Sequence, residues 1–161
     1  MIETPLSDIK FILDVHLGKL AKLLRLLGFD TYLDPGFDDG EIVRFSKSDK
    51  RIILTRDKAL LIRKDVREGY RIISQEPGEQ LKEVLGRFEL KNQIKPFTRC
   101  TECNGLLAEV QKEEIVHRLF PRTIEYYSCF KKCTVCDRIY WEGSHYERMR
   151  KYIDLIINDV N

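Results

Sequence analysis

The chain has 161 residues and a formal net charge of +2, a length that allows one compact domain, alone or with a small module. Hydrophobic residues make up 43% of it, enough for a packed core, and charged residues 34%. No apolar run approaches the ~20 residues that span a bilayer. The near-balanced charge confines any nucleic-acid-binding surface to a local basic patch.

The start of the chain carries no feature of a secretory signal. Residues 1–5, with the sequence MIETP, do not combine a basic segment with a long apolar run. We therefore expect a cytoplasmic, reducing location and no membrane partner. In that setting, pairs of cysteines are better interpreted as metal ligands or redox groups than as structural disulfides.

Strand-like and helix-like segments alternate through the first half of the chain. Short apolar runs predict strands at residues 9–13, 30–33, 51–55 and 70–74. Between and after them, helical spacing of apolar residues predicts helices over 17–27, 41–48, 58–67 and 77–88. Gly28 closes the first of these helices, and Pro77 suits the first turn of the last. This alternation predicts an α/β fold with a parallel sheet flanked by helices on both faces.

The second half has a different organisation. Residues 91–97 form the expected linker, which divides the chain into a first module at 1–95 and a second at 96–161. In the second module, residues 124–127 and 138–141 are candidate strands, and a helix is predicted over 144–157. We expect this module to be small and to depend on a metal ion for its stability.

Two Cys-x-x-Cys pairs carry the strongest chemical signal in the sequence. A tight turn with this spacing directs two thiolates at one ion, and two such turns complete a tetrahedral zinc site. The predicted ligands of a structural Zn²⁺ are Cys100, Cys103, Cys133 and Cys136. Cys129, four residues before Cys133, is the alternative to Cys136. A thiol redox pair is the alternative function.

Several carboxylates follow the predicted strands. Asp14 comes after the first strand, Asp57 after the third, and Asp39 and Glu41 begin the second helix. In a parallel sheet these positions lie at one edge, where oxygen ligands can hold Mg²⁺ or Mn²⁺ for phosphodiester cleavage. Taken singly, each acid has a commoner structural explanation: Asp14 and Asp57 as helix N-caps, and Asp38 with Glu41 as a capping box.

Basic residues accompany these acids. The candidates for contact with substrate phosphates are Lys19, Lys22, Arg25, Arg56 and Lys58. The alternative is a solvated helix face. His16 and His145 have no recognisable nucleophilic partner. In the second module, a further basic surface that could contact RNA contains Lys131, Lys132 and Arg138.

The order of these motifs resembles the Mut-seven C-terminal RNase domain family. The resemblance lies in FILD at 11–14, the helix LGKLAKLLR at 17–25, Asp39-x-Glu41 and ILTRD at 53–57. It continues through RCxxCN at 99–104 and CxxCxxxYWxGSH at 133–145.

This resemblance implies a PIN-like nuclease domain followed by a zinc ribbon, with RNA as substrate and Mg²⁺ or Mn²⁺ as the catalytic cofactor. By position, Asp14 and Asp57 correspond to the strand-end metal ligands of PIN-like domains. Either Asp39 or Glu41 corresponds to the acid at the start of the second helix, and Asp65 is a loose candidate for a further acid.

Two hypotheses follow for the function. The first is a metal-dependent ribonuclease with Asp14, Asp39, Glu41 and Asp57 as its catalytic acids. The alternative is a non-catalytic RNA-binding or ribosome-associated zinc-ribbon protein, in which the acids are helix caps. Cleavage of RNA in the presence of Mn²⁺ separates the two. The oligomeric state is left open by the sequence.

Overall fold

A computed structural model of the chain describes residues 9–160. The expectation about residues 1–5 therefore lies outside the described residues. Over the part that is described, none of the helices combines the length and the apolar character needed to cross a membrane.

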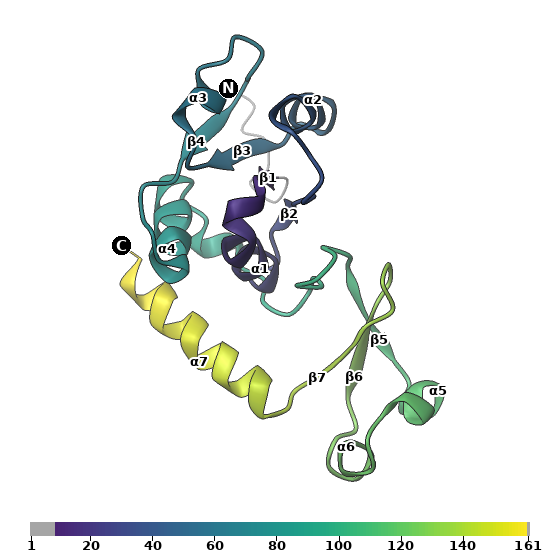
Figure 1. The fold of residues 1–161 in the computed structure, drawn as a ribbon. Coiled ribbons are helices and arrows are strands. Elements are labelled where there is room, and N and C mark those ends of the chain that lie inside the picture. The colour runs from purple at the N-terminus through teal and green to yellow at the C-terminus, as the bar shows by residue number, and fades with distance from the viewer. Residues whose placement is uncertain (1–8, 161) are drawn as a thin grey trace.

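The first module is built on a four-stranded parallel sheet. Its strands are β1 (Lys10–Leu13), β2 (Asp30–Tyr32), β3 (Ile52–Thr55) and β4 (Gly69–Arg71), in the spatial order β2-β1-β3-β4 (Figure 1). The register places Ile12 opposite Ile53 and Leu13 opposite Leu54. The strand order reverses between β1 and β3, and ligands of open parallel sheets bind beyond the carboxyl ends of the strands at such a point.

Helices cover both faces of this sheet. Successive side chains of a strand point to opposite faces, and the core is divided accordingly. Phe11 and Leu13 pack on the face that carries α1 (Gly18–Leu26) and α4 (Pro77–Arg87). Ile12 packs with residues of α2 (Asp39–Asp49) and α3 (Lys58–Leu61) on the other face. The predicted α/β class with a parallel sheet flanked by helices is confirmed.

The first helix ends where the sequence predicted. A 3₁₀ turn over Val15–Leu17 precedes α1, and Gly28 follows it with a φ of 93°. A side chain at Gly28 would be strained by this left-handed backbone and would also collide with the carbonyl oxygen of Lys95. The linker therefore lies directly against the end of α1, where the Lys95 N–H donates to Leu27 O at 2.8 Å.

Two elements of the first module are shorter than predicted. The helix expected over 58–67 is a single turn, because only Leu60 is fully buried and the residues after Leu61 are almost all exposed. Without a continuing apolar face, tertiary packing does not extend the helix. The strand expected over 70–74 is limited to Gly69–Arg71.

The second module contains a three-stranded antiparallel sheet, β5-β6-β7. Its strands are β5 (Leu107–Val110), β6 (Phe130–Cys133) and β7 (Ile139–Trp141). The strand predicted over 138–141 is confirmed as β7. The one predicted over 124–127 is wrong, because Pro121 opens a helix, α6 (Pro121–Tyr126), which covers most of it. This helix, α5 (Lys112–Ile115) and a 3₁₀ turn (Val116–Arg118) form an arm between β5 and β6.

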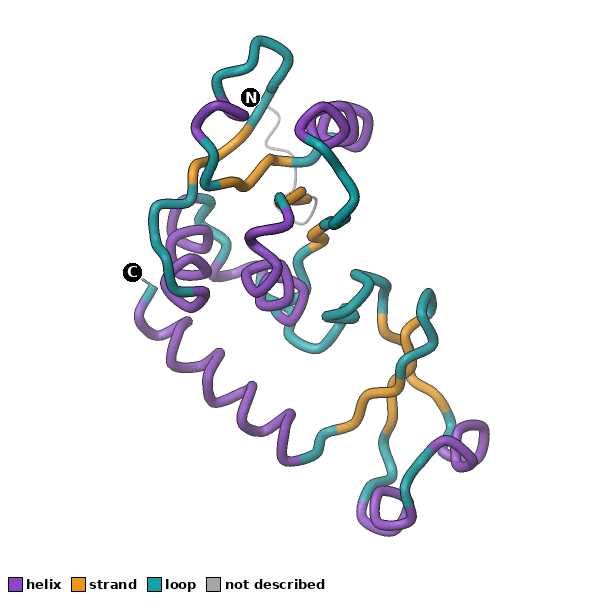
Figure 2. The backbone as a smooth tube through the Cα atoms, viewed as in Figure 1, coloured by secondary structure: helices purple, strands orange, loops and turns teal. Residues whose placement is uncertain are grey.

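The last helix returns to the first module. Helix α7 (Ser144–Asp159) begins at the predicted residue and runs beside α4, so the C-terminal end lies next to the first module (Figures 1 and 2). Ile153 and Ile156 are buried in the same cluster as Leu81 and Val84 of α4. The helix thus belongs by sequence to the second module and by packing to the core of the first. The predicted boundary near residue 95 stays a prediction.

Candidate functional site

The carboxyl edge of β1 and β3 brings together two of the predicted acids. Asp14 directly follows β1, and Asp57 lies two residues beyond the end of β3, whose last residue is Thr55. Since the two strands are hydrogen-bonded neighbours, both acids lie at the point where the strand order reverses. The side chain of Asp14 is half-buried and that of Asp57 is exposed.

Thr55 connects the two acids. Its side chain is fully buried. The Thr55 hydroxyl donates to Asp14 Oδ2 at 2.5 Å and accepts from the Asp57 N–H at 3.0 Å. The hydroxyl therefore fixes one carboxylate oxygen of Asp14. The sequence alone did not predict a role for Thr55, although a polar residue at the end of the apolar run 51–55 is the signal that could have indicated one.

The same acids also cap helices. Asp14 Oδ1 accepts from the His16 N–H at 2.9 Å, and Asp57 Oδ1 accepts from the Ala59 N–H at 2.8 Å. Each cap occupies one carboxylate oxygen. Within the described residues, Asp57 Oδ2 makes no hydrogen bond and remains available to a ligand.

The acids of α2 form a capping box. The Glu41 N–H donates to Asp38 Oδ1 at 2.8 Å, and Glu41 Oε2 accepts from the Asp38 N–H at 2.8 Å. Asp39 is the first residue of the helix and is exposed. Asp65 pairs with Arg63 at 3.1 Å. Among residues 9–160 these acids do not gather within 4.8 Å of one another as a group of three, so the catalytic metal site stays a prediction.

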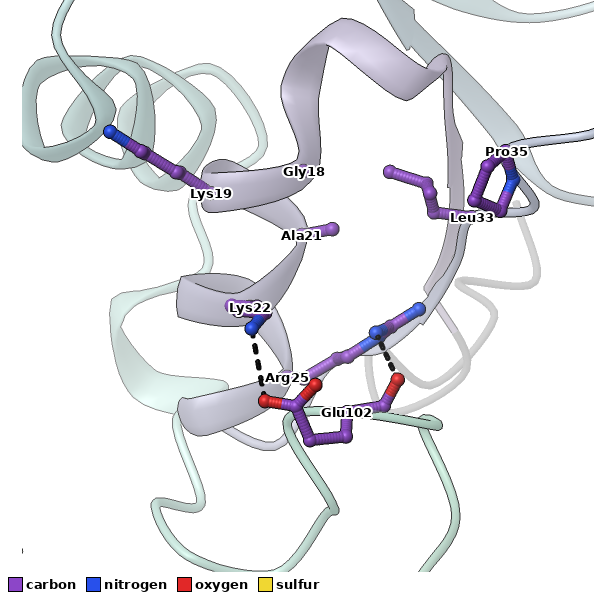
Figure 3. Close-up of a pocket in the computed structure, with 8 residues that line it drawn as sticks. All are labelled: Gly18, Lys19, Ala21, Lys22, Arg25, Leu33, Pro35 and Glu102. Atoms are coloured by element: carbon purple, nitrogen blue, oxygen red, sulfur yellow. Dashed lines mark hydrogen bonds and ion pairs between the residues drawn. The ribbon is translucent and has the colours of Figure 1, made fainter. Parts of the chain in front are cut away.

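The predicted phosphate contacts divide into two groups. Lys19, Arg56 and Lys58 are exposed, and in Figure 3 the Lys19 side chain points away from the other labelled residues. Lys22 and Arg25 instead contact the first cysteine turn. Lys22 Nζ pairs with Glu102 Oε1 at 2.9 Å, and Arg25 is only 7% exposed. For Arg25 the substrate role stays a prediction that these contacts do not support.

Arg25 is held by backbone carbonyls. Its Nε donates to Thr31 O at 2.8 Å, and its Nη1 donates to the carbonyl oxygens of Thr101 and Glu102 at 3.1 and 3.2 Å. Burial lowers the pKa of its guanidinium, against the attraction of Cys103 and other nearby acidic groups. Lys22, Arg25 and Glu102 line a pocket of about 400 Å³ beside α1 (Figure 3).

The four predicted zinc ligands lie together. The sulfur atoms of Cys100, Cys103, Cys133 and Cys136 are all within 4.8 Å of one another. The Cys100 and Cys136 sulfurs are 3.7 Å apart, and those of Cys103 and Cys133 are 3.3 Å apart. Four thiolates around one Zn²⁺, each at about 2.3 Å, lie about 3.8 Å from one another. The cluster is therefore compatible with a structural zinc ion, and exposed Cys129 lies outside it.

The turn after Cys133 favours its thiolate. The N–H groups of Val135 and Cys136 point at Cys133 Sγ, at 3.4 and 3.5 Å. Burial raises the pKa of this thiol, but these donors and the neighbouring Cys103 and Cys136 outweigh it and lower the pKa, while burial raises the pKa of Cys103. A thiolate is the form that binds a metal.

Asn104 attaches the first cysteine turn to the parallel sheet. It has a φ of 71°, which asparagine tolerates better than most residues. Its Oδ1 accepts from the Thr31 N–H at 3.0 Å, and its Nδ2 donates to Asp30 Oδ1 at 2.7 Å. The turn thus covers the free edge of β2. The motif RCxxCN contains Asn104, but the sequence does not show which surface it contacts.

Comparison with known proteins gives one positive result. No curated protein and no solved structure shows a significant match to the chain. The family model described as the Mut7-C RNAse domain matches residues 9–153. This match covers both the parallel sheet with its strand-end acids and the four-cysteine cluster. The protein therefore belongs to the Mut7-C RNAse domain family.

Proposed function

We propose that this protein is a metal-dependent ribonuclease that cleaves RNA phosphodiester bonds at the carboxyl edge of β1 and β3. The single observation that carries the proposal is the arrangement of Asp14, Thr55 and Asp57. In a chain of an RNase family, two carboxylates lie at the strand-order reversal, and one buried hydroxyl bonds the carboxylate of the first and the backbone N–H of the second.

Asp14 and Asp57 would hold Mg²⁺ or Mn²⁺, since hard cations prefer carboxylate oxygens. Thr55 orients Asp14 Oδ2 by its hydrogen bond, and exposed Asp57 keeps its Oδ2 free of hydrogen bonds to the described residues. Asp39 or Glu41 would complete the ligand set. A bound divalent cation supplies charge stabilisation at the phosphate and lowers the pKa of a water molecule.

The exposed cations beside these acids support the same proposal. Lys19 stands at the start of α1, and Arg56 and Lys58 flank Asp57. Their side chains can approach phosphate oxygens on either side of the scissile bond, and such contacts position a nucleic acid without reading its sequence. In the second module, Zn²⁺ on the four cysteines would have a structural role, because all four ligand positions are thiolates.

The decisive variant is Asp14→Asn. The amide keeps an acceptor for the His16 N–H and a polar group beside Thr55, so the fold is retained, but the anionic metal ligand is lost. We expect Mn²⁺-dependent cleavage of single-stranded RNA to fall by a hundredfold or more, about the size of effect seen when a group that stabilises transition-state charge is removed. The measurement is a single-turnover cleavage assay with purified protein.

The matched control is Asp154→Asn, which removes an exposed carboxylate on α7. It should cleave RNA at the wild-type rate. Equal thermal unfolding midpoints and zinc contents of the two variants would show that both are folded. Wild-type activity in folded Asp14→Asn protein would contradict the proposed site.

The second candidate is a non-catalytic RNA-binding protein. The capping bonds of Asp14, Asp57 and Glu41 favour it, since these acids already have structural partners. It predicts that wild-type protein binds RNA in a salt-sensitive way and leaves it intact in Mn²⁺.

A further inference from the structure

A second pocket lies on the second module, and its lining residues, between 101 and 145, are remote in sequence from the strand-end acids Asp14 and Asp57. Its volume is about 440 Å³, and the first cysteine turn, the 3₁₀ turn Val116–Arg118, strand β7 and the start of α7 form its walls. We call it the ribbon pocket. The residues on which the inference depends are Glu102, Arg118, Arg138, Tyr140 and Trp141.

Among the arginines of the ribbon pocket, Arg138 is the one whose side chain makes no direct polar contact within the described residues. Glu102 pairs with Lys22, and Arg118 pairs with Asp137 at 3.0 Å. Lys132 also pairs with Asp137, at 3.3 Å. Within residues 9–160, the exposed guanidinium of Arg138 makes no hydrogen bond or ion pair, and its attraction to Glu102 acts only through space, where it helps to lower the pKa of that carboxyl. Its donors are therefore available to an anion from outside the chain.

The contacts of the three basic residues predicted for the second module leave one of them as the best candidate for binding RNA. Lys131 Nζ donates to Phe97 O at 3.0 Å, so its charge is used to hold the linker. Lys132 shares the Asp137 carboxylate with Arg118, so its charge is only partly compensated. Of the three predicted residues, only Arg138 is exposed, lines the ribbon pocket and, within the described residues, has a side-chain cation without a direct polar contact.

The aromatic side of the ribbon pocket is held in place. The Tyr140 hydroxyl lies 2.9 Å from Cys100 Sγ, which ties this strand to the cysteine cluster. Trp141 packs near Phe130 and Tyr127, with ring centroids 6.1 and 6.5 Å away, and remains half-exposed. Trp141 and Arg138 line the same pocket, and a partly exposed aromatic ring together with an arginine is the combination on which single-stranded nucleic acids stack their bases and place their phosphates.

The ribbon pocket is also adjacent to the pocket in Figure 3. Glu102 lines both of them. The pocket in Figure 3 begins at Gly18 and Lys19, four and five residues after Asp14. A single strand that passes over Glu102 can therefore reach from the ribbon pocket toward the proposed cleavage edge.

We propose that the ribbon pocket binds one nucleotide of a single-stranded RNA, with its base against Trp141 and its phosphate on Arg138. This inference rests on the proposed function for the class of its ligand. It adds a binding site in the second module, which would hold the RNA at a nucleotide remote from the bond that is cleaved. Duplex RNA does not fit the site, because its bases are already stacked in pairs.

Trp141 provides a direct readout, since it is the one tryptophan of the chain. Binding is measured with the full-length Asp14→Asn protein, zinc-loaded and without Mg²⁺ or Mn²⁺, so that no cleavage occurs. We expect a short single-stranded RNA to quench Trp141 fluorescence in a saturable way. A duplex of the same sequence should require at least tenfold higher concentration.

The test variant is Arg138→Glu, and its matched control is Arg122→Glu, which makes the same charge change at an exposed residue of α6 outside the ribbon pocket. We expect Arg138→Glu to weaken RNA binding about tenfold more than Arg122→Glu does, with thermal unfolding unchanged in both. Equal affinities of the two variants, or equal quenching by duplex RNA, would overturn the proposal.

The outcome is separable from that of the proposed function. If wild-type protein does not cleave RNA but Arg138→Glu still loses binding, the ribbon pocket stands and the ribonuclease proposal fails. If cleavage is normal and fluorescence does not respond to RNA, the ribbon pocket is refuted while the cleavage site stands. Quenching by an acidic peptide and not by RNA would also refute it, in favour of a protein partner.

Discussion

Arg51 joins three elements of the first module through one buried guanidinium. Its Nη1 donates to Phe11 O at 3.1 Å and to Asp30 Oδ1 at 2.7 Å, and its Nε donates to Asp49 Oδ2 at 2.6 Å. The guanidinium also lies 5.7 Å from the ring centroid of Tyr32. Strand β1, strand β2 and the end of α2 therefore depend on the same side chain. A buried charge in this setting stabilises the fold only while its partners are present.

We predict that Arg51→Met lowers the free energy of unfolding by about 3 kcal/mol, the lower end of the range for breaking a buried ion pair. Asp30 and Asp49 are partly exposed, so water compensates part of the loss. Urea unfolding measures the change. Lys47→Met is the control, since Lys47 is exposed on α2 and its loss should cost no more than about 0.5 kcal/mol.

Arg51→Met should also change the response to acid. Burial raises the pKa of Asp30, but hydrogen bonds from Arg51 and Asn104 outweigh it and hold the pKa below the ordinary 3.8. A lowered pKa contributes stability above the unfolded-state value, and that contribution is lost as the pH falls below about 4. The wild-type unfolding free energy should therefore fall more steeply below pH 4 than that of Arg51→Met. Parallel curves would contradict this assignment.

At the scale of elements, apolar pattern predicted the first module better than the second. Runs such as 9–13 and 51–55 form strands buried on both faces, so hydrophobicity alone marks them. In the second module, strands β5 and β6 were not predicted. Their sequences, Leu107–Val110 and Phe130–Cys133, mix apolar and charged residues, as is common in an antiparallel sheet with one solvent-exposed face. Residues 124–127 have strand-like composition, yet Pro121 and the arm make them helical.

The candidate site was predictable in its residue types and not in its contacts. The spacing of the cysteine pairs identified the cluster, and strand ends identified Asp14 and Asp57. The sequence did not assign Arg25 to the carbonyls of the first cysteine turn, since that contact joins residues 76 and 77 positions apart. Long-range hydrogen bonds of this kind depend on how the modules dock, and local pattern does not encode docking.

Helix α7 contributes side chains to the core of the first module, so substitutions in it can show whether the two modules unfold together. Ile153 is 2% exposed in the cluster with α4, whereas Leu155 is 69% exposed on the same helix. We predict that Ile153→Ala lowers the free energy of unfolding of the whole chain by about 2–4 kcal/mol, through lost burial and a cavity. Leu155→Ala, the matched control, should change it by less than about 0.5 kcal/mol.

Calorimetry of the two variants gives the measurement. Because α7 belongs to the second module by sequence, a lower unfolding temperature of the entire transition in Ile153→Ala would indicate that the modules unfold together. A wild-type main transition with a separate early one would show instead that α7 detaches without affecting the first module.

At the scale of the whole molecule, the cysteine cluster is connected to the sheet through Asn104. The Thr31 N–H lies on the edge strand β2, and Asn104 Oδ1 accepts from it, while Asn104 Nδ2 donates to Asp30. The cysteine cluster fixes the turn that carries Asn104, and this turn covers the edge of the sheet at β2. Zinc in this cluster would therefore stabilise the docking of the two modules as well as the ribbon itself.

The variant that tests this connection is Asn104→Gly. Glycine accepts the φ of 71° without strain, so the turn keeps its shape while both hydrogen bonds to β2 are lost. We expect a loss of about 1–3 kcal/mol in unfolding free energy and much faster hydrogen exchange of the Thr31 amide, with the four cysteines still binding zinc. Removal of zinc from the wild-type protein should accelerate exchange at the same amide, because it releases the turn that presents Asn104. Continued protection of Thr31 in the zinc-free protein would show that the turn docks on β2 without help from the metal.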